Sequence, residues 1–245
     1  MGRITDAVKH LIILNVIFFA GSSLIGLQLT GLLALFFPEN PNFGFWQFLT
    51  HMFMHGSLVH ILFNMYALWA FGSPLEQMWG RNKFLYFYFS AGIGAGLIYT
   101  AVNYFQFNGI YNDLLALGLQ ASDIQAILDS GRYSTAILET IPEDKLVEMY
   151  QIYNTPAVGA SGAIYGILVA FGMTYPNAKL ALIFLPVPIA AKYFIPVLIA
   201  LDLFSGVTGF SIFGGGIAHF AHVGGALIGF IMMKYWEKNQ FKRWD

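Results

Sequence analysis

Side chains able to do chemistry are few in this sequence, and they gather near the starts of three apolar segments. The stretch VGASGAIYG, residues 158–166, holds one hydroxyl, Ser161, between Gly159 and Gly162. A serine becomes a nucleophile when a base takes its proton, and histidine is the usual base. His222, in the stretch AHVGGALIG, is the candidate base. These residue types predict nucleophilic attack by Ser161 on an acyl carbon.

A second pair of polar residues fits the stabilisation of a developing negative charge. His60 and Asn64 are four residues apart, so both project from one face of a helix and can donate hydrogen bonds into one cavity. A helix that begins near Ser161 adds free backbone N–H groups at its positive end. Together these donors predict an oxyanion hole beside the serine.

Each of these assignments has a structural alternative that the sequence leaves open. Ser161 could be a packing serine between helices, and His222 could be a buried core histidine. His60 and Asn64 could link helices by hydrogen bonds. His219, three residues before His222, is a competing base.

Four further polar residues are expected to stay outside the chemistry. Asp202 could complete a triad, but an exposed acid at a helix end is the simpler interpretation, and we expect that role. Glu76 is predicted to cap backbone groups at the far end of its apolar segment. His51 and His55 are predicted to tether the first loop and the top of the second segment.

The composition places these residues in a lipid bilayer. Of 245 residues, 57% are hydrophobic and 10% are charged, and the mean hydropathy is +0.63, far outside the range of soluble domains. The net charge of −1 gives no sign of nucleic-acid binding, and the absence of cysteine excludes disulfides and thiolate metal sites. We therefore expect a polytopic membrane protein.

Six membrane-spanning helices are predicted from apolar segments of about 20 residues. They cover 11–36, 57–73, 84–105, 160–175, 193–205 and 217–236, within a single domain over 1–245. The first is too long, and too poor in a cleavage site, to be a signal peptide. The polar insert 106–156 is expected to form small interfacial helices. The stretch LIFLPVPIAAK, residues 182–192, is expected to dip into the membrane surface.

The fourth span is unusual because it is too short to cross. A helix that starts near Ser161 has about 15 residues and is roughly 22 Å long, so its N-terminus must end inside the membrane. The preceding stretch NTPAVGAS is predicted to descend as irregular backbone, which requires protein or a water-filled cavity around it. In the sixth span, Gly225 and its neighbouring glycines leave the helix bare enough for close packing.

Basic residues orient the bundle. Ten of the twelve Lys and Arg residues fall on one side of the six-span scheme, and the other two lie in the insert. The positive-inside rule then predicts cytoplasmic termini and an active site that opens to the outer face. Because no soluble domain is attached at either end, we expect a minimal core enzyme in a bacterial cell membrane.

The order of the motifs resembles the rhomboid intramembrane serine proteases over all six spans. The motifs are HMFMHGSLVHILFN (51–64), EQMWGRNKF (76–84), GASG (159–162) and AHVGGALIG (221–229). Each is weak alone, but their order on spans two, four and six is specific. The resemblance implies an all-α six-helix bundle that cuts transmembrane segments of membrane proteins.

The resemblance also implies roles for individual residues. Ser161 and His222 would form a dyad without a carboxylate, with Tyr165 stacked on the histidine ring. Oxyanion donors would be His60, Asn64 and the backbone N–H of Ser161. Substrates would be transmembrane helices that unwind locally and are cut near the membrane boundary at a small residue. The chain departs from the family at Gln47, where arginine is common. This difference bears on how the first loop is anchored and not on the chemistry.

Two functions of other classes remain open. A metal-binding transporter could use His51 and His55, which are four residues apart, as ligands. A proteolytically dead relative could bind transmembrane clients, although such members typically lose the serine or the histidine. The protease requires neither metal nor cofactor, and the sequence predicts neither. It predicts no oligomeric state.

Overall fold

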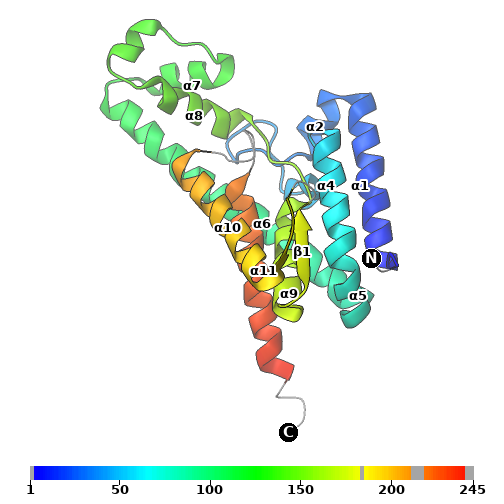
Figure 1. The fold of residues 1–245 in the computed structure, drawn as a ribbon. Coiled ribbons are helices and arrows are strands. Elements are labelled where there is room, and N and C mark those ends of the chain that lie inside the picture. The colour runs from blue at the N-terminus through cyan, green and yellow to red at the C-terminus, as the bar shows by residue number, and fades with distance from the viewer. Residues whose placement is uncertain (1–2, 183–184, 211–217, 241–245) are drawn as a thin grey trace.

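Helices make up most of the structure, a computed structural model that describes residues 3–182, 185–210 and 218–240. Figure 1 shows the long helices gathered into a bundle, with α9 inside it. The helices before Ser161 are α1 (Asp6–Ile25), α2 (Leu27–Leu33), α3 (Gln47–Thr50), η1 (His51–Phe53), α4 (Leu58–Ala67), η2 (Leu68–Gly72), α5 (Ser73–Trp79), α6 (Arg81–Ala116), α7 (Ala121–Ser130), η3 (Thr135–Glu139) and α8 (Glu143–Asn154). They are followed by α9 (Ser161–Thr174), β1 (Lys179–Leu182), β2 (Leu185–Ala190), α10 (Ala191–Thr208) and α11 (His219–Gln240).

Four of the described helical segments are long and apolar enough to cross a membrane. They are Asp6–Ile25, Leu58–Trp79, Arg81–Ala116 and Ala191–Thr208. As predicted, α9 is apolar but has only 14 residues, a rise of about 21 Å that is shorter than the hydrocarbon core. The all-α membrane fold is confirmed, and the total of six spans remains a prediction.

The predicted extent of the first span is wrong. Helix α1 ends at Ile25 because Gly26 has a φ of 72°, a conformation that interrupts a right-handed helix. The short α2 then begins a separate segment. The predicted span 84–105 is also too short, because α6 extends from Arg81 to Ala116 and has 36 residues in all.

The insert folds around an apolar cluster of its own. The end of α6, together with α7 and α8, buries Leu114, Ile124, Leu128, Leu146 and Met149. Figure 1 shows these helices, in green, at the end of α6 that projects beyond the other helices. Small helices form in this insert as expected, and their place at the membrane interface stays a prediction.

A β-hairpin between α9 and α10 was not foreseen from the sequence. Strands β1 and β2 pair antiparallel, with Lys179 opposite Ala190 and Leu182 opposite Leu185. Two prolines lie in the second strand, where they are tolerated because a two-stranded sheet has only edge strands. The predicted dip into the membrane surface includes residues 183–184, which lie outside the described residues.

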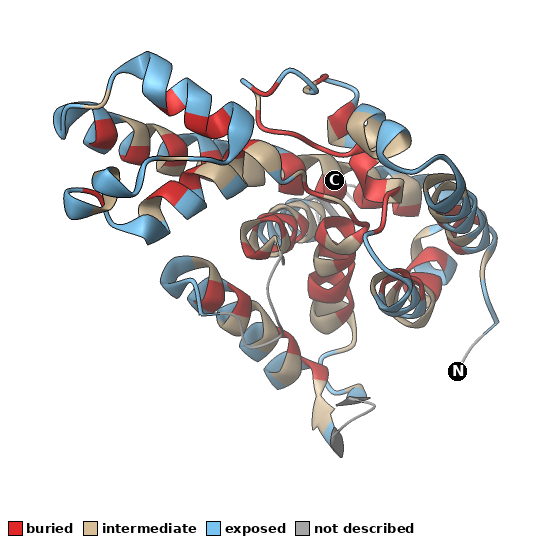
Figure 2. Ribbon diagram, turned by 90° about the horizontal axis from the view of Figure 1, so that it is seen from above, coloured by how far each residue is buried: buried red, intermediate tan, exposed pale blue. Residues whose placement is uncertain are grey.

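Burial is concentrated on the inner faces of the helices. Figure 2 shows buried residues in red toward the middle of the bundle and exposed residues in blue around it. The exposed positions include large apolar side chains such as Ile17, Leu27 and Val207. Such a surface suits a hydrocarbon solvent, in which outward apolar side chains carry no penalty.

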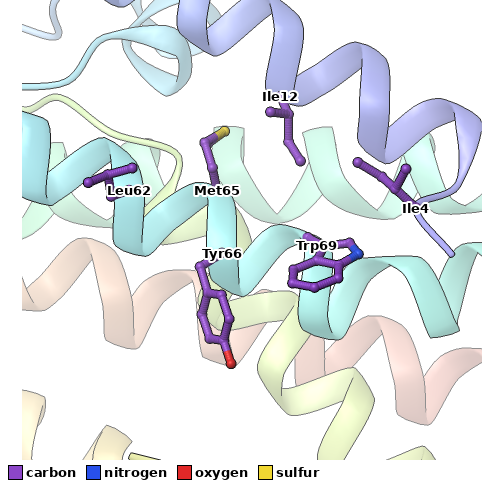
Figure 3. Close-up of a pocket in the computed structure, with 6 residues that line it drawn as sticks. All are labelled: Ile4, Ile12, Leu62, Met65, Tyr66 and Trp69. Atoms are coloured by element: carbon purple, nitrogen blue, oxygen red, sulfur yellow. The ribbon is translucent and has the colours of Figure 1, made fainter. Parts of the chain in front are cut away.

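One groove between α1 and α4 is lined only by large side chains. Its volume is about 480 Å³, and Figure 3 shows the residues around it: Ile4, Ile12, Leu62, Met65, Tyr66 and Trp69. This groove holds no pair of groups suited to catalysis, and Ser161 does not line it. The candidate site lies elsewhere in the bundle.

Candidate active site

The structure brings Ser161 and His222 together although they are 61 positions apart in the chain. Ser161 is the first residue of α9, and His222 lies in the first turn of α11. The serine Oγ is 2.9 Å from Nε2 of the histidine, which is hydrogen-bond distance. Tyr165 stacks on the His222 ring, with centroids 4.2 Å apart and an angle of 11° between the planes. The residues singled out in the sequence therefore meet in one place.

Glycines allow α9 and α11 to touch backbone to backbone. A Cβ atom added at Gly225 would lie 1.9 Å from the carbonyl oxygen of Gly162. One added at Gly229 would lie 2.6 Å from Cα of Gly166. Only glycine permits such an approach, which small residues favour between helices in membranes. This crossing fixes the separation of the serine and histidine, because both lie within one turn of it.

The segment before α9 is held in a non-helical path by Gly159. Its φ of 124° is rare for other residues, and an added Cβ would lie 2.8 Å from Nε2 of His60. The Gly159 N–H donates to the His51 carbonyl at 2.9 Å. Just before it, Ala157 forms an antiparallel bridge with Leu35. The chain thus reaches the serine as irregular backbone, as predicted, and the structure ties this segment to the first loop.

Two donors on α4 converge on the backbone just ahead of the serine. An ideal Cβ on Gly159 would lie 3.5 Å from Nδ2 of Asn64 and even closer to the His60 ring. The Asn64 Nδ2 is buried and finds no hydrogen-bond partner within the described part of the chain. A buried donor without an acceptor costs about 1–3 kcal/mol, so its presence calls for a functional reason. An oxyanion formed beside the serine would supply the missing acceptor.

The expectation that Asp202 is an exposed acid at a helix end is wrong. Its exposure is 3%, because α10 packs this face against α9 and α11. Its Oδ1 accepts hydrogen bonds from Nδ1 of His219 at 2.6 Å and from Nδ1 of His222 at 3.1 Å. Its Oδ2 accepts a hydrogen bond from the Tyr165 hydroxyl. The histidine therefore has a carboxylate partner, contrary to the dyad that the resemblance implies.

The competing base, His219, has a different position from His222. Its Nδ1 bonds to Asp202, whereas the serine Oγ is paired with Nε2 of His222. The two imidazole rings are nearly perpendicular, at 86°, with centroids 6.5 Å apart. This geometry favours His222 over His219 as the base.

The same carboxylate and two histidines form a group of three that metal chemistry could use. Among residues 3–182, 185–210 and 218–240, Asp202, His219 and His222 are the group whose candidate ligand atoms lie within 4.8 Å of one another. The Nδ1 atoms of both rings are already engaged with the carboxylate. His51 and His55, the ligands of the transporter hypothesis, are not part of this group.

Gln47 anchors the first loop despite its departure from the family pattern. The side chain is buried, and its Oε1 accepts from the Phe36 N–H at 3.1 Å. Its Nε2 donates to the Asn42 carbonyl at 2.7 Å and lies within reach of the Leu32 carbonyl at 3.3 Å. A neutral amide, which both donates and accepts, thus ties together the two ends of this loop.

The two histidines of the first loop differ, because His51 has a tethering geometry whereas both ring nitrogens of His55 are buried without a hydrogen-bond partner among the described residues. His51 is buried, with Nδ1 2.7 Å from the Gln47 carbonyl, and its own carbonyl holds Gly159. Burial lowers the pKa of His51 to about 4. Burial, and then repulsion from His60, lowers the pKa of His55 to about 4. Both rings therefore stay neutral at pH 7, which suits the tether at His51 and packing at His55.

Glu76 lies at the opposite end of the bundle and caps α1, as predicted. Its two carboxylate oxygens accept from the N–H groups of Ala7 at 2.8 Å and Val8 at 3.0 Å. The Thr5 hydroxyl donates to the same carboxylate. A carboxylate at a helix N-terminus satisfies free N–H groups and opposes the helix dipole.

Comparison with known proteins shows the family of this chain. The family model described as the Rhomboid domain matches residues 42–238, a range that includes every residue of the candidate site. The chain belongs to the rhomboid family. A rhomboid protease of Salmonella paratyphi A, GlpG, is 40% identical over 72 residues, which is 29% of this chain and 26% of its own length.

Longer matches join the chain to mitochondrial rhomboids. The human presenilin-associated rhomboid-like protein is 29% identical over 184 residues, which is 75% of this chain and 36% of the human protein. Rhomboid protein 1 of Saccharomyces cerevisiae is 26% identical over 186 residues, 76% of this chain and 40% of the yeast protein. The chain thus matches well under half the length of these relatives.

These relatives overturn the expected localisation. The sequence analysis places the chain in a bacterial cell membrane with cytoplasmic termini, but proteins named as mitochondrial match it over three quarters of its length. The positive-inside pattern orients helices relative to a membrane and does not say which membrane it is. The assignment to a bacterial inner membrane is therefore wrong.

Proposed function

We propose that this rhomboid is a serine endopeptidase that hydrolyses peptide bonds in or near transmembrane segments of other membrane proteins. Ser161 is the nucleophile and His222 is its general base. The observation that carries the proposal is the 2.9 Å distance between Oγ and Nε2, at the start of a helix too short to cross the membrane. Family membership supports the same activity.

The reaction proceeds by acyl transfer. His222 Nε2 takes the hydroxyl proton as Oγ of Ser161 attacks the carbonyl carbon, giving a tetrahedral oxyanion. The imidazolium then gives that proton to the leaving amine, and the C–N bond breaks to leave an ester on Ser161. A water molecule, activated by the same histidine, attacks the ester and releases the carboxylate product with the serine regenerated.

Three donors stabilise the oxyanion in this proposal. The buried Nδ2 of Asn64 and the ring of His60 both lie beside Gly159, immediately before the serine. The backbone N–H of Ser161, at the first position of α9, carries the positive end of the helix dipole. Such donors stabilise charge that develops only in the transition state.

The substrate must expose an extended stretch to this site. A transmembrane helix has every backbone carbonyl engaged in its own hydrogen bonds, so the scissile stretch has to unwind before the serine can reach it. We infer that helix-breaking residues near the cut favour cleavage, and that small residues fit beside the glycine-rich start of α9.

The test is cleavage of a model transmembrane substrate by purified protein in detergent. Ser161→Ala and His222→Ala are each expected to abolish the cut, while Ser23→Ala and His10→Ala, both on α1 away from the site, leave it intact. A fluorophosphonate should label the wild type at Ser161. Cleavage that survives both site changes rejects the proposed pair.

The same experiment separates the protease from its rivals. The wild type could fold and retain a transmembrane client, yet neither cleave it nor react with the fluorophosphonate. That result would indicate a non-proteolytic relative. Stoichiometric bound metal that is lost in a His51→Ala, His55→Ala double variant would indicate the transporter. Either result contradicts the proposed function.

A further inference from the structure

A single buried carboxylate joins three helices at the candidate site. Asp202 is on α10 and takes hydrogen bonds from Tyr165 on α9 and from His219 and His222 on α11. Burying an ionised carboxylate is strongly unfavourable unless charge or hydrogen bonds compensate for lost water. Three donors to two oxygens provide that compensation, so the carboxylate can remain ionised inside the bundle.

The position of this carboxylate determines which nitrogen of His222 carries the proton. An acceptor 3.1 Å from Nδ1 favours the tautomer with hydrogen on Nδ1. The other ring nitrogen, Nε2, then presents a lone pair to the serine Oγ at 2.9 Å. This is the tautomer that a general base requires, since the opposite one would point an N–H at the hydroxyl.

The ring of His222 is also fixed in orientation. Asp202 holds one edge, Ser161 meets the other edge, and Tyr165 covers a face with planes only 11° apart. The Tyr165 hydroxyl donates to the same carboxylate, so its stacked ring is anchored as well. Each restraint on the imidazole therefore leads back to Asp202 or to the serine.

We propose that Asp202 is a positioning residue for the Ser161–His222 pair, so that this rhomboid works with a buried Ser–His–Asp triad instead of a dyad. The inference rests on the proposed function. Asp202 does not touch the substrate. It holds His222 in the base-competent tautomer and stabilises the imidazolium that forms when the serine proton is transferred. His219 and Tyr165 are the other donors that keep the carboxylate in place.

The first test is Asp202→Asn, which keeps the size of the side chain but removes its charge. An asparagine can turn its NH₂ toward Nδ1, which forces the proton onto Nε2 and leaves the serine without a base. We expect kcat for the model substrate to fall by about 100-fold or more with KM changed less than threefold. The rate of fluorophosphonate labelling at Ser161 should fall in parallel, because labelling needs the same base and no substrate.

The matched control is Asp113→Asn, which changes an exposed aspartate on α6 that pairs with Lys145 at 2.5 Å. This variant should keep kcat and the labelling rate within threefold of the wild type. Asp202→Glu retains a carboxylate and should recover more activity than Asp202→Asn. Equal loss in the glutamate and asparagine variants would indicate a packing role and overturn the inference.

A measurement on the unaltered protein covers the case in which Asp202→Asn fails to fold. The ¹⁵N NMR spectrum of histidine-labelled protein at pH 7.5, assigned with His222→Asn, reports which ring nitrogen carries hydrogen. A proton on Nδ1 with bare Nε2 supports the inference. A proton on Nε2 overturns it.

Failure of this inference is distinguishable from failure of the proposed function. If the wild type cleaves, Ser161→Ala does not, and folded Asp202→Asn stays within threefold of the wild type, the pair stands and the triad is rejected. If Ser161→Ala still cleaves, the proposed function fails and the triad fails with it.

Discussion

The crossing of α9 with α11 and the neighbouring contact of α1 with α4 differ in what lies between the helices. At the first, glycine faces glycine, and an added Cβ at Gly225 would lie 1.9 Å from a backbone oxygen. At the second, large side chains such as Leu62 and Trp69 surround a groove of about 480 Å³ (Figure 3). Backbone contact leaves no freedom for sliding, whereas a side-chain groove does. The rigid contact is the one that carries the serine and the histidine.

Helix α4 forms part of the second region and also reaches the start of α9 beside the first. One of its faces directs His60 and Asn64 toward the start of α9, and another directs Leu62 and Tyr66 into the groove. Catalytic groups must be held within a fraction of an ångström, and residues that pack against lipid need not be. Substitutions on the two faces should therefore have very different effects, which the following experiments measure.

The largest effect is expected from Gly225→Ala. The new methyl group would occupy the space of the Gly162 carbonyl oxygen, so the helices must separate and the serine must move away from its base. Displacements of about 1 Å at a catalytic centre can cost about 100-fold in rate, and we expect at least that loss of cleavage with a lowered melting temperature.

The control for that change is Gly109→Ala on α6. An added Cβ there meets no atom within 4 Å, so cleavage and melting temperature should stay close to those of the wild type. Equal behaviour of the two variants in substrate cleavage and thermal unfolding would show that the α9–α11 contact is not the rigid element described above.

A smaller effect is expected from Asn64→Ala. Loss of one oxyanion donor should lower kcat by roughly 10- to 1000-fold while the protein stays folded. Tyr66→Ala removes a side chain from the groove face of the same helix and should change kcat by less than threefold. A decrease below threefold for Asn64→Ala would contradict its role as a donor.

Acid should weaken the loop that holds the segment before the serine. The folded-state pKa of His51 is about 4, below the usual value of 6.5, so the unfolded chain binds the proton more readily. The contribution of the neutral His51 ring to the free energy of unfolding is fully present above pH 6.5. It is lost as the pH falls toward 4, and the total loss is about 3 kcal/mol.

The measurement is thermal unfolding of the wild type and His51→Asn at pH 7.5, 5.5 and 4.5. The wild type should be the more stable at pH 7.5, and the difference should shrink toward pH 4.5 because only the wild type has this group to protonate. A difference that grows on acidification would refute the assignment of a buried neutral ring at this position.

The smallest effect is expected from Leu62→Phe in the groove. The larger ring enters existing space between α1 and α4, so kcat should stay within threefold and the free energy of unfolding within about 1 kcal/mol. Kinetics and thermal unfolding check this outcome. A loss as large as that of Gly225→Ala would remove the distinction between the two regions.

Much of this protein follows from its sequence because membranes impose simple rules. Apolar length locates the long helices, and the brevity of the segment after Ser161 predicts a helix that starts inside the bilayer. Polar residues are expensive in such segments, so Ser161, His222, His60 and Asn64 stand out as candidates. Asp202 also stands out in the sequence as a possible third member of a triad, but its place near a span end favours the exposed interpretation.

Only the tertiary structure decided the partners of these residues. The sequence does not reveal that α10 turns Asp202 inward, because a hydrogen bond between helices depends on their rotation and crossing. It does not reveal how Gln47 links both ends of the first loop, or that Gly26 interrupts the first apolar segment. Hydrophobicity determines which segments enter the membrane. Backbone contacts at glycines, and hydrogen bonds between buried polar side chains, determine how those segments face one another.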